Sequence, residues 1–78
     1  MEFRYDKEAD ANYVRLRHEQ YAYGEELDAE RRIDYDGDGK PIGVELLCVS
    51  EGVDVRNLPQ YDAVSELLSR HHIKVLAS

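Results

Sequence analysis

The sequence predicts an α+β domain, with an antiparallel four-stranded meander sheet and one C-terminal helix packed on one face of that sheet. Two observations lead to this fold class. Over residues 1–50, polar and apolar residues alternate in separate runs, which is the pattern of half-buried strands. Nearer the C-terminus, the spacing i, i+3, i+4, i+7 of one helical face occurs at Val64, Leu67, Leu68 and His71. Strands followed by a helix are typical of α+β folds.

The first two strands are predicted to form a hairpin. Residues 2–5 and residues 12–17 both alternate polar and apolar side chains. Residues 6–11 between them are polar and begin with Asp6, a residue type whose side chain can bond backbone groups two residues further on. The connector is therefore expected to turn the chain back on itself.

The third strand is predicted over residues 26–35, after a loop at residues 18–24. Its even positions are mostly charged, and its odd positions carry Leu27, Ala29, Ile33 and Tyr35. This alternation favours a half-buried strand, although Arg31 interrupts the inner face. A helix over residues 25–31 is the alternative, because these residues are good helix formers.

The fourth strand follows the strongest turn signal in the chain, Asp-Gly-Asp-Gly at residues 36–39. Pro41 can open a strand, since it has no N–H to donate there. Residues 42–49 then alternate with apolar side chains on both faces. One row of this strand consists of Ile42, Val44, Leu46 and Cys48. A strand that is apolar on both faces is expected at the centre of the sheet or under a helix.

The remaining residues supply the helix. It is predicted over about residues 59–72, because it opens at a proline, which suits the first helical turn. Residues 73–76 are short and apolar enough for a terminal strand, so the order is β-β-β-β-α-β or the same without the last strand. We expect one domain over residues 1–78, with a sheet core at 2–50 and an extension at 51–78.

Composition excludes several classes of protein. The chain has 78 residues, with 10 Lys and Arg against 17 Asp and Glu, a formal net charge of -7 and one cysteine. No apolar run approaches the roughly 20 residues that span a bilayer, and the N-terminus lacks the apolar stretch of a secretory signal. A lone cysteine forms no internal disulfide, so we expect a cytoplasmic protein. Because so short a chain has little core, a homodimer is the expected source of extra stability.

Residues 34–45 resemble a calcium-binding loop. They read DYDGDGKPIGVE and fit the expression D-x-[DN]-x-[DN]-G-x5-E. The ligands would be Asp34, Asp36, Asp38 and Glu45. An EF-hand needs a helix on each side of the loop, whereas both flanks here alternate with a period of two. We therefore interpret the segment as a tight acidic hairpin, with weak cation binding by its aspartates as the alternative.

Other residues that could carry chemistry favour structural interpretations. His71 and His72 are adjacent, so they cannot chelate one ion in the i, i+4 manner of zinc helices. We interpret His71 as a packed residue at the helix end and Cys48 as a small buried side chain. The sequence contains no zinc-ligand spacing, nucleophile motif or glycine-rich phosphate loop. We expect no catalytic, cofactor-binding or metal-ligating residues, no cofactor and no enzymatic activity.

The charge balance bears on the kind of partner. Phosphate contacts need clustered cations, and only short arginine pairs occur, so nucleic-acid binding is not expected. An acidic sheet suits a basic protein surface. Charge reversal at Glu26, Asp28 and Glu30 is expected to slow association at low salt. Four tyrosines could belong either to an interface or to the core, namely Tyr13, Tyr21, Tyr23 and Tyr35.

Two segments carry a family resemblance. Residues 5–16 read YDKEADANYVRL, and residues 34–47 read DYDGDGKPIGVELL. Together they resemble the small prokaryotic family called domain of unknown function 2283, over about residues 2–50. The resemblance brings no established catalytic residues, and it implies antitoxin-type pairing with a small toxin-like protein for part of the family. This sequence has no basic arm or helix-turn-helix, so binding to an operator is not expected.

These observations lead to two hypotheses. The first is a small acidic interaction module without enzymatic activity, which binds itself or a small basic partner in the manner of an antitoxin. The alternative is a homo-oligomer that binds a metal or a small ligand through the acidic hairpin at Asp34–Asp38.

Overall fold

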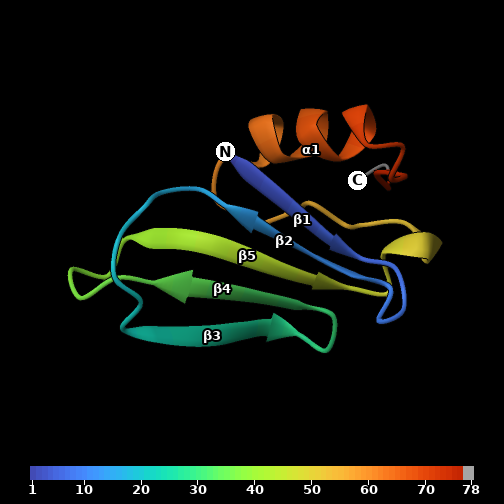
Figure 1. The fold of residues 1–78 in the computed structure, drawn as a ribbon. Coiled ribbons are helices and arrows are strands. Elements are labelled where there is room, and N and C mark those ends of the chain that lie inside the picture. Colours follow the sequence, from blue (N-terminus) through green and yellow to red (C-terminus); the bar gives the residue numbers. More distant parts are fainter. Residues whose placement is uncertain (77–78) are drawn as a thin grey trace.

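The structure is a computed structural model that describes residues 1–76, and it contains one five-stranded antiparallel sheet followed by a helix (Figure 1). The strands are β1 (Glu2–Asp6), β2 (Ala11–Arg15), β3 (Tyr23–Asp28), β4 (Arg31–Tyr35) and β5 (Pro41–Leu47). A short 3-10 helix, η1 (Val49–Glu51), and the helix α1 (Tyr61–Arg70) complete the chain. The predicted α+β class, with an antiparallel sheet and a C-terminal helix, is confirmed.

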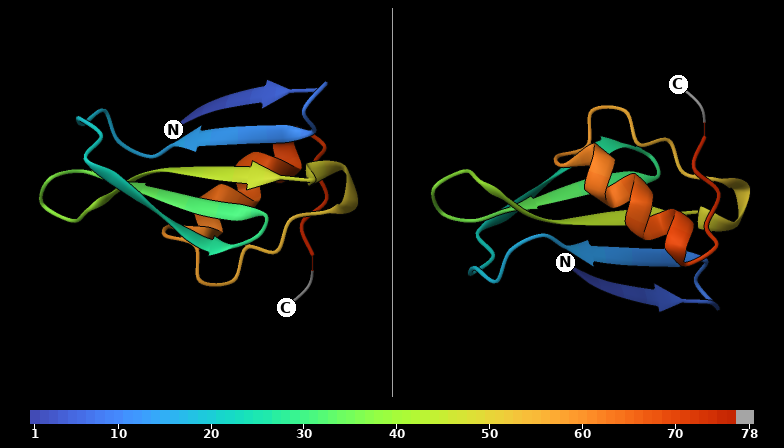
Figure 2. Two further views of the ribbon diagram at one scale, coloured as in Figure 1. Left: turned by 90° about the horizontal axis from the view of Figure 1, so that it is seen from below. Right: turned by 90° about the horizontal axis from the view of Figure 1, so that it is seen from above.

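The strands do not follow the predicted meander order. The sheet has the order β1-β2-β5-β4-β3, so β2 pairs with β5 and not with the next strand in sequence. After β2, the chain crosses to the far edge of the sheet and enters β3, as Figure 2 shows. This arrangement places β5, which has the most apolar side chains, at the centre of the sheet, as predicted for a strand with apolar residues on both faces.

The predicted strand at residues 26–35 is two strands joined by a tight turn. β3 begins earlier, at Tyr23, within the predicted loop, and the chain reverses at Ala29 and Glu30. The Asp28 carboxylate holds this turn, since its Oδ1 accepts a hydrogen bond from the Glu30 N–H at 3.0 Å. Its Oδ2 lies 2.8 Å from the Arg31 guanidinium. An aspartate that bonds the backbone two residues further on forms a turn without a glycine.

The predicted turn at residues 36–39 is confirmed as the connection between β4 and β5. Gly39 has a φ of 78°, a value that favours glycine. β5 ends at Leu47, two positions before the predicted end, because Cys48 takes a left-handed conformation with a φ of 56° and the chain turns into η1.

One face of the sheet is covered by α1 and by the segment that precedes it (Figures 1 and 2). The helix is shorter than predicted: Gln60 precedes it with a φ of 52°, and the His71 N–H bonds the carbonyls of the last turn. The predicted helical face is confirmed for Val64 and Leu68, which are fully buried. The core under α1 consists of Val14, Val44, Leu46, Val49, Val53, Val55, Leu58, Val64 and Leu68.

Residues 73–76 form no strand of the main sheet. They make one parallel bridge, in which Val75 pairs with Val53. The Val53 N–H donates to the Lys74 carbonyl at 2.8 Å, and the Leu76 N–H donates to the Val53 carbonyl at 2.9 Å. Within the part of the chain that is described, no helix combines the length and the apolar character that crossing a bilayer would need.

Candidate interaction surface

Asp36 lies in the calcium-like segment, and its side chain bonds the backbone of its own turn. Its side chain is nearly buried, and its Oδ1 accepts hydrogen bonds from the backbone N–H groups of Asp38 and Lys40, both at 2.9 Å. Its Oδ2 lies 3.6 Å from the Arg17 guanidinium. The hydrogen bond from Lys40, joined by that from Asp38 and by the charge of Arg17, holds the Asp36 pKa below its usual value. The carboxylate thus serves as a cap for the hairpin.

Asp34 is also engaged by neighbouring side chains. The Tyr13 hydroxyl donates a hydrogen bond to its Oδ2 at 2.9 Å, and the Arg32 Nε donates to its Oδ1 at 3.4 Å. Among residues 1–76, the aspartates at 34, 36 and 38 form no cluster of carboxylate oxygens close enough to share an ion. The flanks of the segment are the strands β4 and β5, which excludes the paired helices of an EF-hand.

On the open face of the sheet, opposite α1, the long polar side chains of Tyr13 and Arg32 each lie over a glycine. We call these two side chains and their partners the polar layer. A Cβ atom added to Gly43 would come 1.8 Å from the Tyr13 hydroxyl oxygen, so the tyrosine occupies the space above that glycine. Burial, reinforced by the hydrogen bond to Asp34, raises the pKa of Tyr13 to about 12. The Arg15 guanidinium lies 5.9 Å from the centroid of the Tyr13 ring. The sequence interpretation missed this layer, because it depends on the register between β2, β4 and β5.

Arg32 repeats this arrangement nearer to β3. A Cβ atom on Gly24 would lie 2.5 Å from an Arg32 guanidinium nitrogen, and the guanidinium donates a hydrogen bond to the Tyr21 hydroxyl at 3.1 Å. Arg32 is paired in register with Glu26, yet its charged group lies over Gly24 and contacts Asp34. As a result, Arg32 forms no ion pair with Glu26.

Two carboxylates, those of Glu30 and Glu51, lie beside Cys48. The Cys48 Sγ and one carboxylate oxygen each from Glu30 and Glu51 lie within 4.8 Å of one another. Hydrogen bonding to Glu30 and then burial raise the pKa of the Cys48 thiol, which favours the protonated thiol over the nucleophilic thiolate. Cys48 is half-buried, which is less burial than the sequence interpretation expected.

His71 and His72 are separate from these groups. The His71 ring stacks on Phe3 at 3.9 Å between centroids and an interplanar angle of 4°, although the residue as a whole is exposed. His72 is exposed and has a φ of 63°. His71 therefore packs at the helix end as predicted, and it ties β1 to the C-terminal side of α1.

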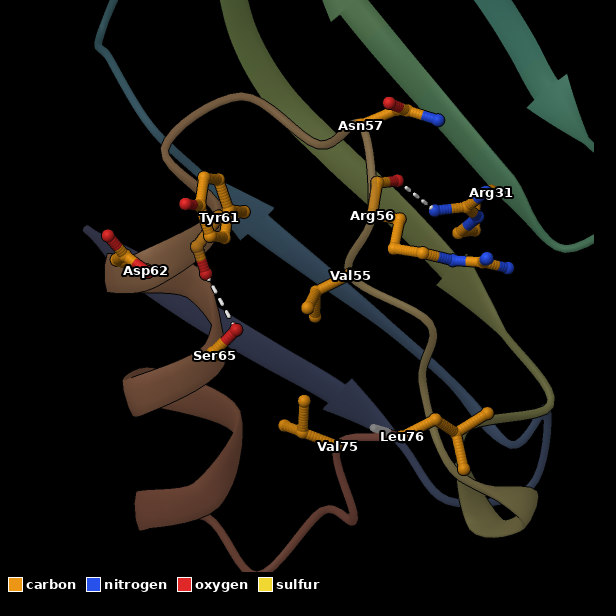
Figure 3. A pocket seen from close by; sticks show the side chains of 9 residues that line it. All are labelled: Arg31, Val55, Arg56, Asn57, Tyr61, Asp62, Ser65, Val75 and Leu76. Atoms are coloured by element: carbon orange, nitrogen blue, oxygen red, sulfur yellow. Dashed lines mark hydrogen bonds between the residues drawn. The ribbon is translucent and has the colours of Figure 1, made fainter. Parts of the chain in front are cut away.

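A hollow of about 740 Å³ lies between the start of α1 and the segment that leads to it (Figure 3). Its lining consists of Arg31, Val55, Arg56, Asn57, Tyr61, Asp62, Ser65, Val75 and Leu76. The Arg31 guanidinium donates to the backbone carbonyls of Asp54 and Arg56, and the Ser65 hydroxyl donates to the Tyr61 carbonyl at 2.7 Å. The Arg31 and Ser65 side chains thus bond the backbone around the hollow, and within residues 1–76 no two lining side chains are hydrogen-bonded as a nucleophile and its base.

The clearest surface for a partner is what we call the acidic edge, formed by β3 and Glu30. Glu25, Glu26 and Glu30 are all exposed, and within residues 1–76 none of them lies in an ion pair. Leu27 and Tyr23 are exposed on the same strand. Carboxylates beside exposed aromatic and aliphatic side chains are a composition that suits a basic protein partner.

The structure brings together the predicted acidic residues, but they do not contribute equally to the charge of the acidic edge. Glu26, Asp28 and Glu30 lie on one hairpin, as the charge-reversal prediction requires. The charge of Asp28 is offset by Arg31, whose hydrogen bond holds the Asp28 pKa below its usual value. Glu25, which was placed outside the predicted strand, belongs to the edge instead.

The four tyrosines divide into two pairs. Tyr21 and Tyr23 are exposed, whereas Tyr13 and Tyr35 are half-buried. The rings of Tyr23 and Tyr35 stack with 5.0 Å between their centroids.

Comparison with known proteins identifies a family for most of the chain. A family model described as "Protein of unknown function (DUF2283)" matches residues 2–50, which are 49 of the 78 residues. The chain gives no significant match to a curated protein or to a solved structure. The matched residues include the whole sheet and the acidic edge, whereas α1 lies outside them.

Proposed function

We propose, for a chain that belongs to the DUF2283 family of proteins of unknown function, a role as a non-enzymatic interaction module that binds a small basic protein. The observation that carries this proposal is the acidic edge, with three exposed carboxylates at Glu25, Glu26 and Glu30 that form no ion pair with any cation among residues 1–76.

The electrostatics of the whole chain act in the same direction. The formal net charge of -7 attracts a basic partner over a distance of about one Debye length and raises the rate of encounter at low salt. Once the partner is bound, the exposed Tyr23 and Leu27 supply apolar contact beside the carboxylates. A small basic enzyme that the module covers, as an antitoxin covers a toxin in the cytoplasm, fits this chemistry.

The same edge suits a basic partner better than a second copy of the chain. Two copies that met through β3 would bring the carboxylates of Glu25 and Glu26 toward those of the other copy. Like charges directly opposite one another on paired strands are destabilising.

The test compares two variants with the same change in net charge. Tagged wild-type protein is expected to retrieve a small basic protein in a one-to-one ratio from extracts of its own source at low salt. Glu25→Lys/Glu26→Lys should reduce the recovery at least tenfold, because it reverses the charge of the edge. Glu8→Lys/Glu66→Lys changes two exposed glutamates far from β3 in sequence and should retain the partner.

Equal recovery by both variants would contradict the proposal, and so would a one-to-one partner with an acidic surface. Circular dichroism of both variants should show the wild-type sheet, since the four glutamates are exposed.

A further inference from the structure

We infer that the acidic edge receives an extended segment of its partner as a sixth strand of the sheet, and that this segment carries two consecutive basic residues opposite Glu25 and Glu26. This inference rests on the proposed function and specifies how the partner binds.

β3 is an unoccupied edge of the sheet. It pairs with β4 on one side and has no other neighbouring strand within residues 1–76 (Figures 1 and 2). An edge strand presents backbone N–H and C=O groups that another chain can pair with. Addition of a strand to such an edge is a recurring way in which proteins recognise extended peptides.

The other edge of the sheet lacks the same charge preference. β1 carries both signs, with Arg4 between two carboxylates, and its Glu2 already lies 3.5 Å from Arg15. Every charged residue of β3, in contrast, is acidic. Charge complementarity therefore favours β3 as the edge for a basic strand.

The position of each carboxylate defines what the added strand must carry. Glu25 is paired with Ile33, so it lies on the face of the sheet whose central strands are covered by α1. Glu26 is paired with Arg32 and lies on the open face. Successive side chains of a strand point to opposite faces. Two consecutive basic residues in the added strand would thus place one cation on each face, beside one carboxylate each.

Neither carboxylate lies in an ion pair within the part of the chain that the structure describes. The neighbour of Glu25 in register is the apolar Ile33. The neighbour of Glu26 is Arg32, whose guanidinium lies over Gly24 and bonds Tyr21 and Asp34 instead. A cation from outside therefore meets no competing cation in an ion pair at either position.

The bulge in β3 limits where the strand can pair. The register with β4 shifts between Glu26 and Asp28, so regular pairing ends at Glu26. Bulges and charges at edges prevent uncontrolled association of sheets. Here they restrict pairing of the sixth strand to residues 23–26. They also disfavour pairing with β3 of a second copy of the chain, whereas a basic strand can still bind.

The test uses three synthetic peptides of equal length and composition, with blocked termini and alternating threonine and valine around one lysine and one arginine. In the first peptide the two basic residues are adjacent. In the second they are separated by one residue, so that both would lie on the same face. The third has the first sequence with an N-methyl group on every backbone amide, which removes all of its backbone donors and keeps its charge.

We expect the adjacent-pair peptide to protect backbone amides of residues 23–26 from hydrogen exchange, and to bind at least tenfold more tightly than the N-methylated peptide. The separated-pair peptide should bind several-fold more weakly than the adjacent-pair peptide. Glu25→Lys/Glu26→Lys should lose the protection, and Glu8→Lys/Glu66→Lys should keep it.

Three results would overturn the inference: equal binding of the N-methylated peptide, protection of β1 in place of β3, or no protection of residues 23–26 by the adjacent-pair peptide at millimolar concentration. If the natural partner is still captured through Glu25 and Glu26 in that case, the proposed function stands and only the strand addition fails. If capture does not depend on these glutamates, the proposed function fails independently of the peptide result.

Discussion

Leu46 and Leu47 are neighbours in β5, yet they lie on the two different faces of the sheet. Leu46 has no exposed surface and packs in the core under α1, whereas 39% of the surface of Leu47 is exposed. The covered face is held by apolar packing. The open face is held by long polar side chains that lie on glycines, with Tyr13 over Gly43 and Arg32 over Gly24. The comparison shows that the open face has a packed structure of its own, although no helix within residues 1–76 covers it.

The largest expected effect is a difference in the free energy of unfolding between alanine variants of the two leucines. Leu46→Ala should lower the free energy of unfolding by about 2 to 5 kcal/mol, because it leaves a cavity in a fully buried site. Leu47→Ala should change it by about 0.5 kcal/mol, because the side chain is partly in water. Urea denaturation followed by circular dichroism measures both values. Similar losses for the two variants would contradict the distinction between the faces.

The next effect tests whether the open face is packed. Gly43→Ala should cost about 1 to 3 kcal/mol, because the new Cβ would clash with the Tyr13 ring. In a Tyr13→Ala background, the same Gly43→Ala change should be neutral or stabilising, since alanine is less costly than glycine within a strand. The double-mutant cycle is measured by urea denaturation. Additive effects of the two substitutions would mean that the tyrosine does not occupy this space.

A smaller effect is expected at acid pH. The pKa values of Asp28, Asp36 and Asp54 are all lowered in the folded protein by hydrogen bonds to their carboxylates. Groups with lowered folded pKa values stabilise the protein above their unfolded pKa values, and this stability is lost as the pH falls through the folded values. Stability should therefore be constant near pH 6 and fall below about pH 4.

Asp36→Asn sharpens this acid test. The amide oxygen can still accept the N–H groups of Asp38 and Lys40, while the carboxylate charge near Arg17 is removed. Urea midpoints measured between pH 2 and pH 6 should show a smaller dependence on pH than those of the wild type. An unchanged slope would place the acid sensitivity in the other carboxylates.

The smallest effect is expected at alkaline pH and belongs to the open face alone. Burial and Asp34 raise the pKa of Tyr13 from 10.0 to about 12. A raised folded pKa gives stability that is fully present below pH 10 and is lost as the pH rises toward 12. Absorbance at the tyrosinate band should show one tyrosine that ionises near pH 12, and Tyr13→Phe should remove it. A wild-type titration without this late step would contradict the Tyr13–Asp34 bond.

The two hairpin turns explain which parts of the fold were predictable. The turn at residues 36–39 contains two glycines and was identified from sequence. The turn at Ala29 and Glu30 contains none, because the Asp28 side chain supplies the bond that shapes it. The turn itself pairs Asp28 with Arg31, but the register shift between Glu26 and Asp28 places the odd positions of β3 opposite the odd positions of β4. One alternating strand therefore seemed to continue through residues 26–35. The helix had clear periodicity and was predicted, but it is two residues shorter at each end, and of its predicted face Val64 and Leu68 are buried.

The strand order and the polar contacts of the open face depend on the long-range pairing of β2 with β5. Strands that are consecutive in sequence are usually neighbours, and the meander prediction followed that tendency. Once β5 lies between β2 and β4, Tyr13, Gly43 and Asp34 come together from three strands. No spacing within the sequence encodes that meeting. The acidic residues of β3 were visible from sequence, but their position on an unoccupied edge was not.

The central position of β5 has a consequence for how the protein is made. Both outer hairpins, β1–β2 and β3–β4, leave the ribosome before the strand that joins them. The helix that covers Val44 and Leu46 is synthesised later still, roughly 20 residues after β5, which takes about 1 to 4 s at typical translation rates. During that interval the nascent chain displays a nearly complete sheet with one bare apolar face. Chaperones that bind newly made chains would therefore meet this protein at the stage between β5 and α1.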